Sequence, residues 1–180
     1  MRVVVSGGGT AGHITPALSV ASYLQDNDVE VFYAGTPQGP EGNLARNAGL
    51  SFKAFEASGF NRTKPLTIVK GVRLILKSTR AALCWFEEIK PDVVVGFGGY
   101  VSIPVARAAQ KMRIPVVLHE QNSVMGLANK YLSKHAQKVC LTYEYASRDV
   151  ADKSKIVLTG NPVRKEILTA TRKEGRAMLG

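Results

Sequence analysis

The sequence predicts an α/β protein built on a doubly wound, mostly parallel sheet. Short apolar runs rich in β-branched residues alternate with stretches of helical length along the chain. Runs of this kind are typical of parallel strands, because helices cover both faces of the sheet. Two of the runs lead directly into glycine-rich turns, as expected where a strand passes into a helix. The length of 180 residues fits one domain with one core.

Each element follows from this alternation of apolar runs and helical periodicity. Strands are predicted over Val3–Ser6, Val29–Ala34, Ser51–Phe55, Asp92–Gly96, Val116–His119, Lys138–Leu141 and Ile156–Thr159. Helices are predicted over Pro16–Leu24, Glu41–Ala48, Thr67–Glu88, Ile103–Met112, Gly126–Ser133 and Arg164–Thr169. The stretch after Thr169 lacks apolar periodicity, which predicts a linker-like tail. In a doubly wound sheet, ligands bind at the carboxyl ends of the strands.

The charge balance predicts an anionic partner. The chain has 24 Lys and Arg against 14 Asp and Glu, a net charge of +10, and an isoelectric point near 9.8. A composition of 45% hydrophobic and 21% charged residues is that of an ordinary globular protein. Nucleic-acid binding is the alternative of a different class. The sequence shows no helix-turn-helix, no zinc spacing and no aromatic RNA-binding motif, so no nucleic-acid partner is expected.

Neither a metal site nor a membrane span is expected. Cys84 and Cys140 lie in apolar stretches without a CxxC motif, which predicts buried, reduced thiols. The apolar run at the N-terminus is too short for a signal peptide. The segment Leu66–Phe86 is interrupted by Lys and Arg and cannot cross a bilayer as a bare helix. We therefore expect a soluble or peripheral protein.

The first glycine turn, Gly7–Gly12, follows the first strand and opens a helix, with Pro16 suited to the first helical turn. Backbone N–H groups in such a turn can approach an anion closely, and the helix dipole favours negative charge. The turn also satisfies the dinucleotide pattern GxGxxG, which requires an acid at the end of the second strand. The nearest acid, Glu30, lies at the beginning of that strand, so a nicotinamide or flavin is disfavoured and no cofactor is expected. A tight turn without a ligand remains the alternative.

Two further loops follow strands at the same edge of the sheet. The second glycine turn, Gly96–Gly99, again comes before a helix, and two backbone-amide cradles facing one crevice suit a diphosphate. The third loop, His119–Lys130, is dense in hydrogen-bonding side chains, which suits a sugar or a carboxylate. Any one of these side chains, His119 especially, can equally be a satisfied structural residue.

Four motifs follow one another along the chain: Gly7–His13 with Pro16, Gly98–Ser102 with Pro104, His119–Asn122 with Gly126, Asn129 and Lys130, and Thr159–Arg164. In order and spacing these motifs resemble the N-terminal half of the MurG family of peptidoglycan glycosyltransferases. One departure is Ala11, where the family has glycine; an added methyl keeps the amide donor.

The resemblance implies a GT-B enzyme with two Rossmann-like domains, of which this chain is the acceptor half. Residues 1–163 would form the acceptor domain, and residues 164–180 would lead into a missing C-terminal donor domain. The implied reaction transfers GlcNAc from UDP-GlcNAc to the C4 hydroxyl of lipid I, giving lipid II with inversion. The implied location is the cytoplasmic face of the bacterial plasma membrane. The 180-residue chain alone is expected to be inactive. A non-catalytic sugar-phosphate or nucleotide-binding domain is the alternative.

Residue roles are predicted from the motifs and the resemblance together. His13 and Glu120 are the candidate general bases, with a structural cap as the alternative for His13. The acceptor diphosphate is assigned to Gly8, Gly9, Thr10, Gly98, Gly99, Tyr100 and Ser102. The resemblance assigns the UDP-GlcNAc side to Thr10, Ala11, Gly12, Asn122 and Arg164. For Arg164, an interdomain salt bridge is an equal alternative.

The helix predicted over Thr67–Glu88 is basic and apolar at once. From Ala57 to Phe86 there is no acid, and there are six bases, of which Arg62 and Lys64 precede the helix. Helical spacing places Ile68, Val72, Ile75, Leu76, Leu83 and Phe86 on one face, interpreted as the core face. A neighbouring strip is predicted to contact an anionic membrane, and it consists of Lys70, Arg73, Leu74, Lys77, Arg80 and Trp85. The alternative is a solvated basic face with Trp85 in the core.

Overall fold

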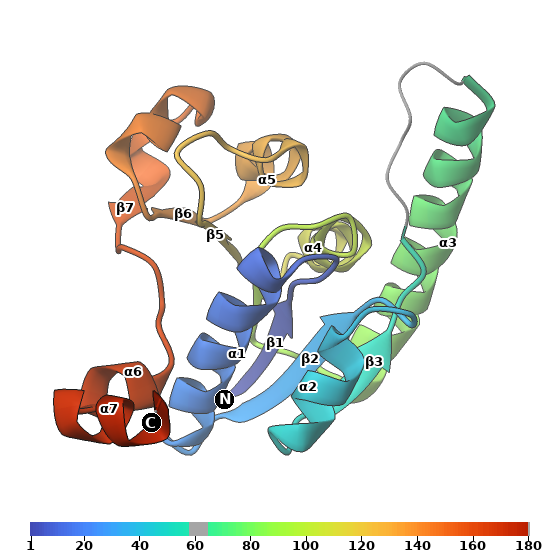
Figure 1. The fold of residues 1–180 in the computed structure, drawn as a ribbon. Coiled ribbons are helices and arrows are strands. Elements are labelled where there is room, and N and C mark those ends of the chain that lie inside the picture. Colours follow the sequence, from blue (N-terminus) through green and yellow to red (C-terminus); the bar gives the residue numbers. More distant parts are fainter. Residues whose placement is uncertain (58–64, 180) are drawn as a thin grey trace.

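A seven-stranded parallel sheet forms the centre of the protein (Figure 1). The computed structural model describes residues 1–57 and 65–179. The strand order is β3-β2-β1-β4-β5-β6-β7, so the chain winds outward from β1 in both directions. The strands are β1 (Arg2–Ser6), β2 (Glu30–Gly35), β3 (Ser51–Ala54), β4 (Val93–Gly96), β5 (Val116–Glu120), β6 (Lys138–Leu141) and β7 (Ile156–Leu158). The predicted doubly wound parallel sheet is confirmed.

Helices follow most strands and cover both faces of the sheet. The α-helices are α1 (Ala11–Gln25), α2 (Glu41–Asn47), α3 (Pro65–Ile89), α4 (Ser102–Lys111), α5 (Leu127–Leu132), α6 (Lys165–Thr169) and α7 (Arg172–Leu179). Short 3-10 helices are η1 (Ser133–His135), η2 (Glu144–Asp149) and η3 (Lys153–Lys155). Within the described ranges, no helix is both long and apolar enough to span a bilayer.

The core has two layers because successive side chains of a strand point to opposite faces. In β1, Val4 joins the cluster under α3 and α4, whereas Val3 and Val5 join the cluster under α1 and α2. Trp85 and Phe86 of α3 lie in the first cluster together with Phe55. Both faces of β1 are therefore buried, which explains why its sequence is apolar without alternation.

The first helix begins five residues earlier than predicted. Pro16 lies inside α1 rather than in its first turn, and the glycine turn runs directly into the helix at Ala11. Proline has no N–H, so the carbonyl of Gly12 receives no bond from the residue four positions on. Thr10 is the N-cap, and its carbonyl accepts from the N–H of His13 and of Ile14, each at 3.1 Å. The N–H groups of the first helical turn therefore open toward the carboxyl end of the sheet.

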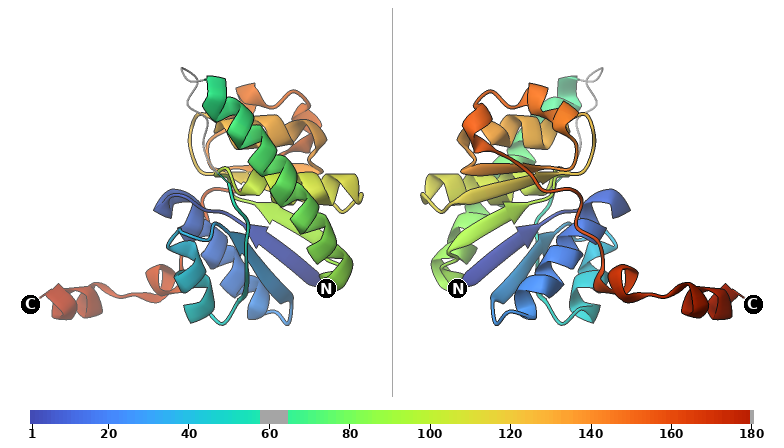
Figure 2. Two further views of the ribbon diagram at one scale, coloured as in Figure 1. Left: turned by 90° about the vertical axis from the view of Figure 1, so that its right-hand side faces the viewer. Right: turned by 90° about the vertical axis from the view of Figure 1, so that its left-hand side faces the viewer.

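Helix α3 departs from the predicted orientation. Its C-terminal half packs on the sheet, and Trp85 is only 7% exposed, with its ring centroid 6.1 Å from that of Phe32 and 5.6 Å from that of Phe55. The prediction that Trp85 contacts a membrane is therefore wrong, and the core alternative is right. Toward its N-terminus α3 runs beyond the sheet (Figure 2), which leaves Val72 46% and Leu76 55% exposed instead of buried in the core.

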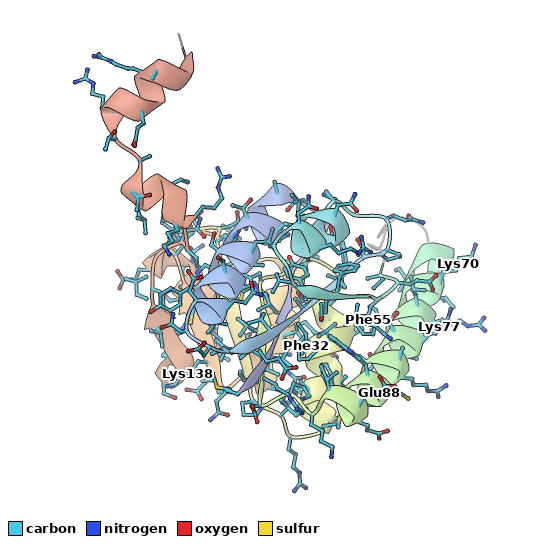
Figure 3. All side chains as sticks on the ribbon, turned by 90° about the horizontal axis from the view of Figure 1, so that it is seen from below. Phe32, Phe55, Lys70, Lys77, Glu88 and Lys138 are labelled. Carbon is cyan, nitrogen blue, oxygen red and sulfur yellow. The ribbon has the colours of Figure 1, made fainter. Side chains whose placement is uncertain are left out.

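The predicted basic strip lies on the outer face of α3. Figure 3 shows Lys70 and Lys77 pointing away from the body of the protein, whereas Phe32 and Phe55 point inward. Lys77 pairs with Glu56 at 3.3 Å, and both side chains are exposed. The two other bases of the segment, Arg62 and Lys64, lie outside the described residues.

The C-terminal tail is helical rather than linker-like. Thr171 precedes α7 and accepts a bond from the N–H of Glu174 at 3.3 Å, while the Glu174 carboxylate accepts from the N–H of Thr171 at 2.8 Å. These reciprocal bonds form a capping box, which stabilises the first turn of α7. Figure 2 shows α7 extending away from the sheet.

Candidate functional site

The site is built where β1, β4 and β5 end. Ser6, Gly96 and Leu118 stand side by side in the sheet, and the N–H of Phe97 donates to the carbonyl of Ser6 at 2.7 Å. The loops that follow these strands therefore meet at one edge, as the parallel topology predicts.

The two glycine turns pack directly against each other. Gly99 has φ +77°, and a Cβ on it would overlap the backbone carbonyl of Gly8. Gly98 has φ +95°, which is also in the region that favours glycine. On the first turn, Gly9 and Thr10 are exposed. The predicted proximity of the two turns is confirmed, and both conformation and close approach require glycine at position 99.

His13 lies across the junction of the two turns. Its Nδ1 is 3.0 Å from the hydroxyl of Thr10. A Cβ on Gly98 would lie 3.0 Å from the Nε2 and Cδ2 atoms of the ring, and 3.5 Å from Asn129 Nδ2. The imidazole is half-buried, and within the described part of the chain its Nε2 has no hydrogen-bond partner. One ring nitrogen is thus held by Thr10, and the other is available.

Glu120 is engaged on both carboxylate oxygens. Its side chain is 1% exposed. Oε1 accepts from the N–H of Asn122 at 3.0 Å and from its Nδ2 at 2.9 Å, and Oε2 accepts from the N–H of Gly126 and from Asn129 Nδ2, both at 3.0 Å. These bonds fold the third loop around a buried carboxylate. The geometry makes Glu120 an organiser of this loop, with no lone pair directed at an open surface.

Ser102 serves the second turn rather than a ligand. Its side chain is fully buried, and its hydroxyl lies 2.7 Å from the carbonyl of Gly98 and 3.1 Å from that of Ser6. The prediction that this hydroxyl contacts a diphosphate is wrong, because it is directed inward and closes the turn against β1. Tyr100, in the same turn, is half-buried and borders an apolar groove described below.

The residues assigned to the donor side are not all brought together. Thr10, Ala11 and Gly12 lie consecutively at the start of α1, and all three are exposed. Arg164 instead lines a pocket with Tyr23 and Asp26, near the C-terminal end of the same helix. The adjacent Lys165 pairs with Asp26 at 3.2 Å. The expected proximity of Arg164 to the first turn is therefore absent from this structure.

The cysteines are free thiols in different surroundings. Cys84 is exposed on α3, so the prediction that it is buried is wrong. Cys140 in β6 is half-buried, and burial raises the pKa of its thiol. Within residues 1–57 and 65–179, no cluster of His, Cys, Asp and Glu is placed to hold a metal ion.

His119 connects the end of β5 to the segment after β7. Its Nε2 is 2.9 Å from the carbonyl of Gly160 and must donate to it, so the neutral ring accepts from Gln121 Nε2 on Nδ1, at 3.1 Å. The ring is 4% exposed and packs 5.4 Å from Phe97 between centroids. Burial is the main influence on His119 and lowers its pKa. The alternative that His119 is structural fits these contacts.

This buried imidazole predicts a stability that depends on pH. Because the pKa of His119 is lower in the folded state, the unfolded chain binds more protons as the pH falls below about 6.5. Stability is lost in that window, since a proton on Nδ1 also removes the acceptor for Gln121. We expect urea unfolding to show a larger loss between pH 7 and 5 for the wild type than for His119→Gln. An equal pH dependence in the two proteins, with exposed His135→Gln as control, would contradict this assignment.

Comparisons with known proteins identify the family. Residues 3–141 match the model of the glycosyltransferase family 28 N-terminal domain. A relative from Halalkalibacterium halodurans is 42% identical over all of this chain and 50% of its own length, and one from Acetivibrio thermocellus is 39% identical over all of this chain and 49% of its own. Both are named UDP-N-acetylglucosamine–N-acetylmuramyl-(pentapeptide) pyrophosphoryl-undecaprenol N-acetylglucosamine transferase. The chain thus spans about half the length of the curated relatives it matches.

Solved structures agree with this result. MurG from Acinetobacter baumannii is 32% identical, with a TM-score of 0.76 over 91% of this chain and 46% of that one. A UDP-GlcNAc 2-epimerase from Neisseria meningitidis, bound to UDP-GlcNAc, is 18% identical, with a TM-score of 0.65 over 89% of this chain and 46% of that one, and shares the fold. Fold, site motifs and family model coincide, and the chain belongs to glycosyltransferase family 28, whose N-terminal domain it matches.

Proposed function

We propose that this chain is the acceptor-binding half of an inverting N-acetylglucosaminyltransferase. The donor is UDP-GlcNAc, and the acceptor is lipid I, a polyprenyl diphosphate that carries N-acetylmuramoyl-pentapeptide. The match of the entire chain to transferases named for these substrates is the observation that carries the proposal. The proposal assigns residues 1–163 to the acceptor domain and residues 164–180 to the passage into a donor domain.

The paired glycine turns suit the acceptor diphosphate. Gly8 and Gly99 bring two backbone segments into contact, and α1 begins just after the first turn. Free N–H groups at the start of a helix, together with the helix dipole, favour an anion. We assign the diphosphate to the backbone of Gly9, Thr10 and Gly99, with the Tyr100 side chain beside it. Gly8 and Gly98, which the sequence also assigned to the diphosphate, are buried beneath these residues and support the turns instead. Thr10, Ala11, Gly12 and Asn122 face the donor side in this proposal.

His13 is the general base that the geometry favours. With Nδ1–H donating to the Thr10 hydroxyl, Nε2 keeps its lone pair for the proton of the acceptor C4 hydroxyl. As that proton moves to Nε2, the oxygen attacks the anomeric carbon of GlcNAc and forms the new glycosidic bond. The bond from this carbon to UDP breaks, UDP leaves with the electron pair, and the configuration inverts. Glu120 and Asn129 support the site from the third loop.

A transfer assay with radiolabelled sugar tests this proposal. The 180-residue chain alone should form no labelled lipid II from UDP-GlcNAc and lipid I, because it spans about half the length of the transferases it matches. The same chain joined to the C-terminal half of a relative should restore transfer. Clear product from the chain alone, or none from the joined protein although both substrates bind, would overturn the proposal.

We further propose that α3 binds an anionic membrane through an apolar groove together with the basic strip beside it, without Trp85. A groove of about 530 Å³ lies between α3, α4 and α5. Its walls include Val72, Ile75 and Leu76, and it extends from Tyr100 to the bases Arg107 and Lys111. Lys70, Arg73, Leu74, Lys77 and Arg80 lie on the neighbouring face of the same helix. An exposed apolar surface flanked by bases is suited to the headgroup region of a bilayer, on the cytoplasmic side in this proposal.

Vesicle flotation of the chain provides the test of this surface. Binding to vesicles rich in anionic lipid should fall with added salt, since the bases are screened. Replacing Val72 and Leu76 with glutamate should reduce binding about tenfold or more, because each buried aliphatic side chain contributes about 1.5–3 kcal/mol. Leu44→Glu, at a side chain 44% exposed on α2, is the control and should bind as the wild type does. Equal recovery with neutral vesicles would rule out the electrostatic part.

A further inference from the structure

A buried carboxylate that the sequence did not single out lies directly beneath the first glycine turn. Glu41 is the first residue of α2, and its side chain is completely buried. Acidic residues at a helix start commonly face solvent, where they interact with the dipole. Burying a carboxylate is costly unless its oxygens are satisfied, so a fully buried one calls for a specific reason.

The contacts of Glu41 connect the loop after β2 to the first glycine turn. Oε1 accepts from the N–H of Thr36 at 2.8 Å and from its hydroxyl at 2.6 Å. A Cβ on Gly8 would overlap this same oxygen, and one on Gly35 or Gly39 would also overlap the Glu41 side chain. Three glycines, Gly8, Gly35 and Gly39, therefore enclose the side chain of Glu41. Within the described residues, Oε2 has no hydrogen-bond partner.

Tyr33 completes the support below the turn. Its side chain is fully buried in β2, and its hydroxyl donates to the carbonyl of Gly7 at 2.9 Å. Burial, with the nearby negative charge of Glu41 as a second cause, raises the pKa of this phenol. The hydroxyl therefore stays protonated and keeps donating. Tyr33 holds the turn through Gly7, and Glu41 holds it through contact with Gly8.

We propose that Glu41 is a positioning residue for the acceptor site. Its side chain holds the first glycine turn in place relative to the second. This inference rests on the proposed function, because the turn is assigned to the acceptor diphosphate. Gly8 is the residue through which Glu41 acts, since one side of Gly8 touches Glu41 and its carbonyl touches Gly99. Glu41 acts through the shape of its side chain, which fills the space beside Gly8, and through Oε1, which accepts the hydrogen bonds of Thr36. A glutamine can supply both, and an alanine can supply neither.

The first test reads the turn itself and needs no activity. In ¹⁵N-labelled wild-type chain and variants, the amide resonances of Gly8, Gly9 and Gly99 report on the position of the two turns. Glu41→Ala should shift or broaden these resonances, whereas Glu41→Gln should leave them near their wild-type positions. Glu144→Ala, at an exposed acid of η2, is the matched control. Unchanged glycine resonances in Glu41→Ala would overturn the proposal whatever the protein's function.

The second test measures transfer by the chain joined to a donor half. Misplacement by about 1 Å can cost about a hundredfold in rate, so Glu41→Ala should lower kcat/KM for the acceptor by about ten- to a hundredfold. Glu41→Gln should stay within about threefold of the wild type, because it keeps the shape and the Thr36 acceptor. A wild-type protein that transfers no sugar, combined with shifted glycine resonances in Glu41→Ala, would refute the proposed function but keep the positioning role.

A double-mutant cycle separates positioning from general destabilisation. Gly8→Ala should reduce kcat/KM strongly when Glu41 is present, because the added methyl collides with the enclosed carboxylate. In the Glu41→Ala background the same change should add little further loss, since the overlap with the carboxylate is gone and the remaining close neighbour is Val101 Cγ1 at 3.2 Å. Independent sites give additive effects, so additivity here would contradict direct contact as the means of positioning.

Discussion

Replacing His13 with alanine should lower kcat for GlcNAc transfer by about 10²–10⁴-fold, the usual contribution of a positioned general base. The Nε2 atom of this ring is the available nitrogen at the junction of the two glycine turns, and Thr10 holds the other nitrogen. Acceptor binding should largely survive, because the backbone amides of the turns remain. The measurement is steady-state kinetics of the chain joined to a donor half, with both substrates varied.

Two variants sharpen the test of His13. Thr10→Val removes the partner of Nδ1 and should lower kcat less than His13→Ala does, since the imidazole stays but loses its orientation. His135→Ala changes an exposed histidine of η1 and should have no effect. If His13→Ala raised KM for the acceptor and left kcat unchanged, His13 would be a binding residue and the base would lie elsewhere.

Replacing Glu120 with alanine should destabilise the protein by about 1–3 kcal/mol, the cost of leaving a buried donor unpaired. That donor is the side-chain amide of Asn129, which is 2% exposed. The bonds from Asn122 and Gly126 would be lost as well, but these two residues are exposed and their donors can bind water. Glu120→Gln should also destabilise the fold, because its NH₂ group would face groups that donate. Urea unfolding of the 180-residue chain measures both changes.

Urea unfolding of Glu120→Gln, combined with the transfer kinetics of the same variant joined to a donor half, also decides between the two candidate bases. An organising role for Glu120 predicts that loss of activity accompanies loss of stability in the glutamine variant. A catalytic role predicts that Glu120→Gln stays as stable as the wild type while kcat collapses. The second outcome would contradict our assignment of His13 as the base.

The sheet could be predicted from the sequence because its signals are local. Apolar β-branched runs such as Val93–Val95 mark strands whichever partners they find, and glycine turns mark the strand ends. Helix α1 begins before the position that Pro16 predicts, because Pro16 lies within the helix and not at its start. The tail helix α7 does not follow from apolar periodicity, because a capping box starts it.

The periodicity of helix α3 does not predict which part of its apolar face is buried. Spacing groups Val72 and Leu76 with Phe86 on one face, but only the tertiary structure shows that the sheet ends before the helix does. The same face is therefore core at one end and groove wall at the other. The bases near Trp85 in the sequence predict a solvent-facing position for the same reason, whereas in the structure Phe32 and Phe55 pack against its ring.

The sequence predicts the site in outline, whereas the roles of its polar groups depend on the tertiary structure. The close approach of Gly8 and Gly99 is expected, because their two turns follow adjacent strands of the sheet. Whether a polar side chain points to a ligand or into the fold does not follow from its place in a motif. Ser102 and Glu120 both point inward, and Glu41 supports the turn from a segment with no recognised motif.

The most direct test of the central claim is calorimetric titration of the 180-residue chain with each substrate separately. The ligands are a short-chain, soluble lipid I analogue with an intact diphosphate and UDP-GlcNAc. We predict saturable binding of the lipid I analogue, weakened by Gly99→Ala, and no measurable binding of UDP-GlcNAc. Saturable binding of UDP-GlcNAc with no binding of the lipid I analogue would contradict the assignment of this chain as the acceptor half.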